Sequence, residues 1–152
     1  MTASGPLNHP THFTSDSQGR LASITDALGN VTQIGYFGGD VASVQDPLGN
    51  VSRQMADVAG RVISGIDAQG NTSRLQYSSL NLLTQSTDPQ GHTTHFVYDA
   101  NGNLLSLTDA LNHSTSYAYD NMDRITTRTD PLLRAESYVY DQNGNLRERG
   151  HP

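Results

Sequence analysis

The chain contains no cysteine, few basic residues and no long apolar run. Without cysteine, a disulfide framework and a thiolate metal site are both excluded. Nine basic residues stand against fifteen acidic ones, for a net charge of −6. They form no cluster of the kind that binds phosphate backbones, so we expect no nucleic-acid partner. No apolar stretch approaches the ~18 residues of a membrane span. The first thirteen residues lack the apolar segment of a signal peptide, so we expect any export signal to lie outside this sequence.

Hydrophobic residues are also scarce, at 34% of the chain, and charged residues make up only 16%. This composition is too polar for an ordinary compact core. It is also too rich in regularly placed tyrosine, leucine, valine and isoleucine for a disordered tract. We therefore expect a thin structure whose interior is only partly apolar.

A turn-like segment recurs every 20 or 21 residues, and internal repeats of this kind decide the fold. The segments begin with aspartate and mostly carry glycine at their fourth position: Asp26 with Gly29, Asp46 with Gly49, Asp67 with Gly70, Asp88 with Gly91, and then Asp109 and Asp130 without glycine. The register extends to residues 5–9 and 151–152. It predicts a non-repeat leader at 1–4 and seven units over 5–152, beginning and ending at one phase, as a piece of a longer array would.

A second series of turns lies between the first. Its copies begin at Asp16, Asp57, Asp99 (with Gly102) and Asp141 (with Gly144), and weaker copies begin at Ser78 and Asp120. An aspartate at the first position accepts hydrogen bonds from backbone amides two residues on. Asn81 and Asp123 replace glycine at the fourth position, and these types tolerate a left-handed backbone. We predict positive φ at every fourth position, with Leu133 as the strained copy.

Segments of about six residues, rich in threonine, tyrosine and aliphatics, separate the turns and are typical of strands. The sequence predicts an all-β fold: tandem 21-residue hairpins in a curled antiparallel sheet of about twelve to fourteen strands, with hardly any helix. Side-chain alternation places one aromatic column on a single face. The aromatic column comprises Tyr36, Tyr77, Phe96, Tyr98, Tyr117, Tyr119, Tyr138 and Tyr140, with Leu21, Val41, Val62, Leu83, Leu104, Ile125 and Leu146 beside it. The alternate positions are polar: Gln33, Arg53, Arg74, His95, Ser116 and Ser137.

Keeping that column on one face requires a definite register, because a slip of one residue reverses every side chain. We predict that Leu104 lies opposite Tyr98 on one side and opposite Tyr117 on the other, which places Thr108 opposite His113.

Two irregularities break the repeat. The single deletion falls in residues 37–39, where a tighter turn with positive φ at Gly38 or Gly39 is expected to absorb it. In the third unit Gln54 and Ala56 replace the aromatic pair, which makes this the weakest point of the column.

The unit that runs from Tyr98 and Asp99 through Gly102 to Leu104, followed by Thr108 and Asp109, resembles the YD repeats of the Rhs, insecticidal toxin-complex and teneurin families. The resemblance extends over residues 5–152. It implies a spiral β-shell that encloses a toxic domain in bacterial members, or that forms part of an adhesion ectodomain in teneurins. It also implies a secreted or cell-surface protein whose partners are flanking repeats or domains. The self-cleaving segment of bacterial members has no counterpart here.

No catalytic, cofactor-binding or metal-ligating residue is predicted. His92 and His113 share a column, but imidazoles ~10 Å apart cannot share one zinc ion. The turn aspartates are spread singly, whereas calcium needs 6–8 converging oxygens. We interpret the tyrosines as the packed face of the sheet, with binding of a carbohydrate or a partner protein as the alternative function. The open face and edges of so short a sheet further predict self-association or burial in a larger assembly.

Overall fold

The computed structural model describes residues 2–4 and 10–150, which form fifteen strands and no helix. No helix that could cross a membrane is therefore present in this part of the chain. The strands are β1 (Thr2–Ser4), β2 (Pro10–Ser15), β3 (Leu21–Thr25), β4 (Val31–Phe37), β5 (Asp40–Gln45), β6 (Val51–Ala56), β7 (Val62–Ile66), β8 (Thr72–Tyr77), β9 (Leu83–Thr87), β10 (Thr93–Tyr98), β11 (Leu104–Thr108), β12 (Ser114–Tyr119), β13 (Ile125–Thr129), β14 (Ala135–Tyr140) and β15 (Leu146–Gly150). There is one strand more than the highest expected number.

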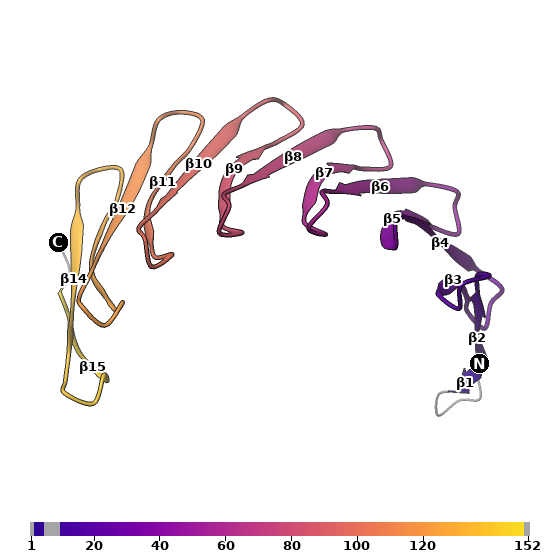
Figure 1. The fold of residues 1–152 in the computed structure, drawn as a ribbon, viewed down its shortest axis with the longest axis horizontal. Coiled ribbons are helices and arrows are strands. Elements are labelled where there is room, and N and C mark those ends of the chain that lie inside the picture. Colours follow the sequence, from indigo (N-terminus) through magenta and orange to yellow (C-terminus); the bar gives the residue numbers. More distant parts are fainter. Residues whose placement is uncertain (1, 5–9, 151–152) are drawn as a thin grey trace. The chain divides into compact units, whose positions relative to one another are not determined.

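The chain divides into two compact units, Met1–Arg74 and Leu75–Pro152, and strand β8 runs across the boundary. Within the first unit, each strand from β1 to β7 pairs antiparallel with the next one along the chain. The same holds in the second unit from β9 to β15. Figure 1 shows this succession of hairpins in chain order. The predicted all-β antiparallel fold is confirmed.

Both series of turns share one backbone geometry. In each, the amide of the fourth residue donates to the carbonyl of the first, over 2.9–3.2 Å. The amide of the first residue donates to the carbonyl of the fifth, over 2.8–3.0 Å. A left-handed fourth residue after such a turn closes a three-residue hairpin loop with a bulge. Wherever this five-residue turn occurs, it therefore connects its two strands in the same way.

The predicted left-handed positions are confirmed. The non-glycine residues with positive φ are Asn81 (63°), Asn112 (64°), Asp123 (58°) and Leu133 (63°), each at the fourth position of its turn. The expected deletion is confirmed as well, because Gly38 and Gly39 have φ of 63° and 112° and form a two-residue loop between Phe37 and Asp40. The missing residue thus shortens one turn and leaves the strands in register.

Replacing Leu133 by glycine should raise the free energy of unfolding. A left-handed backbone costs a side chain with a Cβ about 1–2 kcal/mol, and the extra freedom of glycine in the unfolded chain offsets roughly 0.4–1 kcal/mol of the gain. Leu133 is 84% exposed, so little packing is lost. We expect a net gain of up to about 1 kcal/mol in chemical denaturation. The same change at Leu132, also exposed and in the same turn, is the control and should not stabilise. A destabilised Leu133→Gly variant would contradict the strain argument.

The register prediction holds for one turn and is wrong for the other. Tyr98 lies opposite Leu104, as expected. Thr108, however, lies opposite Ser114 rather than His113, and Leu107 lies opposite Thr115, so Leu104 does not pair with Tyr117. Five residues lie between the paired residues that flank each kind of turn, Tyr98 and Leu104 in one and Thr108 and Ser114 in the other. The predicted register requires the two turns to differ, whereas they are alike.

The change of register is made within the strand instead. Val97 pairs with Ser106 while Tyr98 pairs with Leu104, so Leu105 is an extra, bulged residue. A bulge sets two residues of one strand against one of its neighbour. The same shift follows every second-series turn whose pairing is described.

This bulge keeps the aromatic column on one face. Phe96 lies opposite Leu107, which lies opposite Thr115, and Tyr117 is two residues further along the same strand. Residues two apart share a face. Without the extra residue, the 21-residue repeat would place Tyr117 on the opposite face from Phe96. The single-face prediction therefore survives the wrong register.

The sheet has one partly covered face and one exposed face. No apolar side chain among the described residues is fully buried, and only Thr115 and Asp130, each 8% exposed, fall in the buried class. The tyrosines of the column are half-buried, whereas the intervening positions in β10, β12 and β14 are exposed. The six polar positions expected to face outward, from Gln33 to Ser137, are all exposed. The part of the chain that the structure describes is therefore a thin sheet without a closed apolar core.

Candidate functional site: turn clamps and the tyrosine column

Each turn aspartate fastens its own turn through both carboxylate oxygens. In the turn that begins at Asp26, Oδ1 accepts the amides of Leu28 and Asn30 over 2.8 and 2.9 Å. Oδ2 accepts the side-chain amide of Asn30 over 2.7 Å. We call this arrangement the turn clamp: an aspartate, its carboxylate bonds, and the side chain four residues on.

Within residues 10–150 the clamp recurs at eleven turns, and in each of them its second side chain is asparagine, arginine or histidine. The pairs are Asp16–Arg20, Asp26–Asn30, Asp46–Asn50, Asp57–Arg61, Asp67–Asn71, Asp88–His92, Asp99–Asn103, Asp109–His113, Asp120–Arg124, Asp130–Arg134 and Asp141–Asn145. The aspartates were predicted as turn residues, but their side-chain partners were missed. The signal was present, because the fifth turn position in each copy carries a hydrogen-bond donor.

Hydrogen bonding lowers the pKa of all eleven turn aspartates below the ordinary 3.8. For Asp26 the side-chain amide of Asn30 contributes most to the lower pKa. For Asp88 burial acts to raise the pKa, and the bonds from His92 outweigh it. Donors aimed at a carboxylate stabilise its charged form. The clamps are therefore charged turns, and their integrity depends on pH.

The histidines of the first turn series close onto their own turns. His92 Nδ1 lies 2.8 Å from Asp88, and His113 Nδ1 lies 3.0 Å from Asp109. Within the described ranges, no group of three or more His, Asp or Glu side chains is placed to hold a metal ion. His92 and His113 therefore have the same role as the asparagines and arginines of the other clamps, which is to bond the aspartate of their own turn.

Three of the tyrosines that lie ten residues after a first-series aspartate reach a backbone carbonyl of the preceding strand. The hydroxyl of Tyr36 donates to Leu21, that of Tyr119 to Leu104 and that of Tyr140 to Ile125, each over 2.9 Å. Burial raises the pKa of the Tyr119 phenol. Each ring thus lies across the beginning of a neighbouring strand and ties two strands together through a contact fifteen residues apart.

Two of these rings are also covered by a clamp arginine. The guanidinium of Arg20 lies 4.2 Å from the ring centre of Tyr36, and that of Arg124 lies 4.7 Å from that of Tyr140. A cation over an aromatic face is attractive by about 0.5–1 kcal/mol at exposed sites. The clamp and the tyrosine column are therefore one connected structure in these repeats.

In the third 21-residue repeat, Gln54 substitutes for the missing tyrosine. The expected column residue there is Ala56, which cannot reach a carbonyl. Instead the side-chain amide of Gln54 donates to the carbonyl of Val41 over 2.8 Å. Val41 occupies the position of Leu21 one unit earlier, so the polar bond is retained although the ring is lost.

Amide hydrogen exchange should therefore remain faster at residues 52–58 than at 94–98. The Gln54 bond replaces one hydrogen bond, but a half-buried ring contact of about 2 kcal/mol is absent. We expect protection factors to differ by roughly thirtyfold. Mass spectrometry of overlapping peptic fragments would measure this, with the matching residues of β12 as the reference. Equal protection of the two segments would show that the ring contributes nothing.

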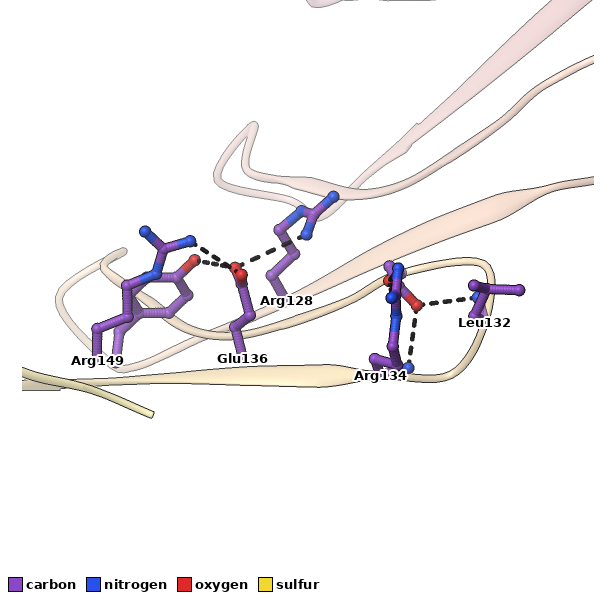
Figure 2. Close-up of polar contacts among 7 residues, drawn as sticks. Arg128, Leu132, Arg134, Glu136 and Arg149 are labelled. Carbon is purple, nitrogen blue, oxygen red and sulfur yellow. Dashed lines mark hydrogen bonds and ion pairs between the residues drawn. The ribbon is translucent and has the colours of Figure 1, made fainter. Parts of the chain in front are cut away.

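A charged cluster interrupts the apolar face in the second unit. Glu136 accepts hydrogen bonds from the hydroxyl of Tyr138 (2.7 Å) and from Arg149 (2.9 Å), and lies 3.7 Å from Arg128. Figure 2 shows Arg128 and Arg149 on either side of Glu136, with dashed lines from both to its carboxylate. The hydroxyl of Tyr138 and then Arg149 lower the pKa of Glu136. Arg128 stands at the register position of Leu107 and Glu136 at that of Thr115, so polar pairing replaces apolar contact here. Nothing in the sequence pattern predicted it.

Comparison with known proteins identifies this architecture. A family model described as Teneurin YD-shell matches residues 7–114, and one described as RHS Repeat matches residues 98–135. No curated protein sequence matches the chain.

Among solved structures, the Photorhabdus luminescens Tc holotoxin pore superposes with a TM-score of 0.76 at 18% identity, over 94% of this chain. The TcdB2–TccC3–Cdc42 and TcdB2–TccC3 crystal structures superpose at 17% identity with TM-scores of 0.76 and 0.75, each over 95% of this chain. The chain spans only 9% of each of these solved chains. At this identity, the likeness establishes the fold.

Proposed function

Because the chain belongs to the teneurin YD-shell family, we propose that it is a scaffold segment whose sheet encloses or displays another domain of its parent protein. The observation that carries the proposal is the uniformity of the repeats. Eleven turns carry the same clamp, and the column stays on one face throughout each unit. A catalytic site would set one turn apart by its chemistry, whereas here each of the eleven clamp aspartates fastens its own turn.

The thin sheet supports the same proposal. Its covered face is only half-buried and needs a further surface to exclude water from the rings. Flanking repeats, an enclosed toxin or effector domain, or a second copy of the chain would provide that surface. On the ground of the same family membership, we propose a secreted or cell-surface location.

Paired cysteine variants test enclosure, since the chain has no native cysteine. Thr94 and His95 are neighbours in β10 on the covered and exposed faces respectively. Thr94→Cys and His95→Cys would be made in the isolated chain and in the full-length protein, and labelled with a bulky maleimide.

If the sheet walls off a domain, one of the two cysteines should react markedly more slowly in the full-length protein than in the isolated chain. The other should react equally in both. Equal rates at both positions would reject enclosure. Protection at both positions would indicate burial between two partners rather than a wall.

Carbohydrate binding through the tyrosines is less well supported. Arginines cover the rings of Tyr36 and Tyr140, and these hydroxyls are already bonded to backbone carbonyls. Saturable glycan binding in calorimetry that is lost in both Tyr98→Ala and Tyr119→Ala would nevertheless favour a binding module over a scaffold.

A further inference from the structure

The first unit has a pocket where the tyrosine column is interrupted. It lies at the ends of β5 and β6 and has a volume of about 300 Å³. Small-molecule sites range over about 300–1,000 Å³, so the pocket is large enough for one ring. Its walls include Phe37, Val41, Ala42, Gln54, Ala56 and Val58. All of these belong to two adjacent hairpins of the first unit.

The preceding repeat shows what normally occupies this place. There the ring of Tyr36 crosses to the carbonyl of Leu21, and the guanidinium of Arg20 lies over the ring. One repeat later the corresponding positions are Ala56, Val41 and Asp40. The ring is replaced by a methyl group and the cation by a carboxylate. The pocket therefore lies where the preceding repeat has a tyrosine ring, and the charge beside it is negative (Asp40) instead of positive (Arg20).

The lining of the pocket suits an apolar side chain that carries a cation beside it. Its polar backbone group, the carbonyl of Val41, is already satisfied by Gln54. Phe37 and Val58 are 83% and 110% exposed, so apolar surface flanks the opening. Among the described residues, the carboxylate of Asp40 has neither a hydrogen-bond nor an ion-pair partner. The second acid in the wall, Asp57, is held by Arg61.

We propose that this pocket binds a polypeptide segment that presents an aromatic side chain next to an arginine or lysine. The ring completes the column over Val41, as Tyr36 does over Leu21. The cation meets Asp40, which restores the pairing of ring and charge that Arg20 and Tyr36 make within the chain. The repeat that lacks its own ring thus becomes the docking point for a partner. This binding does not depend on whether the sheet encloses a domain.

Three blocked dipeptides test the proposal in NMR titrations of the chain. Acetyl-Tyr-Arg-amide carries the ring and the cation, acetyl-Ala-Arg-amide lacks the ring, and acetyl-Tyr-Glu-amide reverses the charge. We expect acetyl-Tyr-Arg-amide to bind with an affinity on the order of millimolar, and to shift the amide signals of residues 37–42 and 54–58. Acetyl-Tyr-Glu-amide should bind about two- to fivefold more weakly, the range for an exposed ion pair. Acetyl-Ala-Arg-amide should give no saturable shift.

Two variants separate the ring from the charge. Ala56→Tyr fills the pocket and should abolish binding, whereas Ala118→Tyr, on the exposed face of β12, adds the same side chain elsewhere and should leave binding intact. Asp40→Asn should make the affinities for the arginine and glutamate peptides equal. Absence of saturable shifts, unchanged binding in Ala56→Tyr, or an unchanged charge preference in Asp40→Asn would each overturn the proposal.

Discussion

The thermal midpoint of unfolding should fall steeply as the pH is lowered from about 4 to 2, and should change little between about pH 5 and 8. Eleven turn aspartates have pKa values lowered by the hydrogen bonds of the clamps. A carboxyl group whose folded pKa lies below its unfolded value of 3.8 adds stability above that value. The contribution is lost as the pH falls through the folded pKa. Because all eleven act in the same direction, acid should weaken every turn together.

Single substitutions would identify the clamps as the cause. Asp99→Asn retains a side-chain oxygen for the turn amides but loses the second oxygen that accepts Asn103. It should lower the midpoint at pH 7 and reduce the further loss at pH 3. Asp40→Asn makes the same change at an aspartate that belongs to no clamp, and it should leave the dependence of the midpoint on pH unchanged. Differential scanning calorimetry across the pH range measures both. A profile that stays flat down to pH 2 would rule out the clamps as the main electrostatic support.

Turn chemistry made the positions of the turns predictable from the sequence. Only glycine, asparagine and aspartate adopt positive φ cheaply, so Gly38, Asn81 and Asp123 could be assigned from residue type and spacing. Leu133 could be assigned by periodicity alone, against its own preference. The same periodicity showed that the aromatic residues must stay on one face.

Periodicity could not locate the residue that keeps the face constant. An odd repeat length requires one unpaired residue per repeat, and a bulge in the turn or in the strand satisfies that count equally well. The predicted register places it between Thr108 and His113, whereas in the structure it is Leu105. The contact of Gln54 with Val41 was unpredictable for a similar reason. It depends on how far an amide side chain reaches across a strand.

The tyrosine column should account for much of the stability of the second unit. Tyr119→Phe removes the hydrogen bond to the carbonyl of Leu104 and should cost about 0.5–1.5 kcal/mol. Tyr119→Ala removes the ring as well, and for a half-buried site we expect about 2–3 kcal/mol, below the usual range for a core aromatic residue. Urea denaturation monitored by circular dichroism would measure both. Equal stabilities of the Phe and Ala variants would show that the ring does not pack.

The third repeat, in which Gln54 and Ala56 replace the aromatic pair, suggests how the loss of a tyrosine can be compensated. Tyr117 occupies the position of Gln54, and the pair Gln54 and Ala56 keeps the carbonyl of Val41 bonded over 2.8 Å. Tyr117→Gln should therefore be less harmful in the Tyr119→Ala background than alone, because its amide can then reach the carbonyl of Leu104. In a double-mutant cycle the two changes should couple favourably by about 1 kcal/mol. Strict additivity would mean that Gln54 merely fills space in its own repeat, and that the carbonyl bond does not stabilise the column.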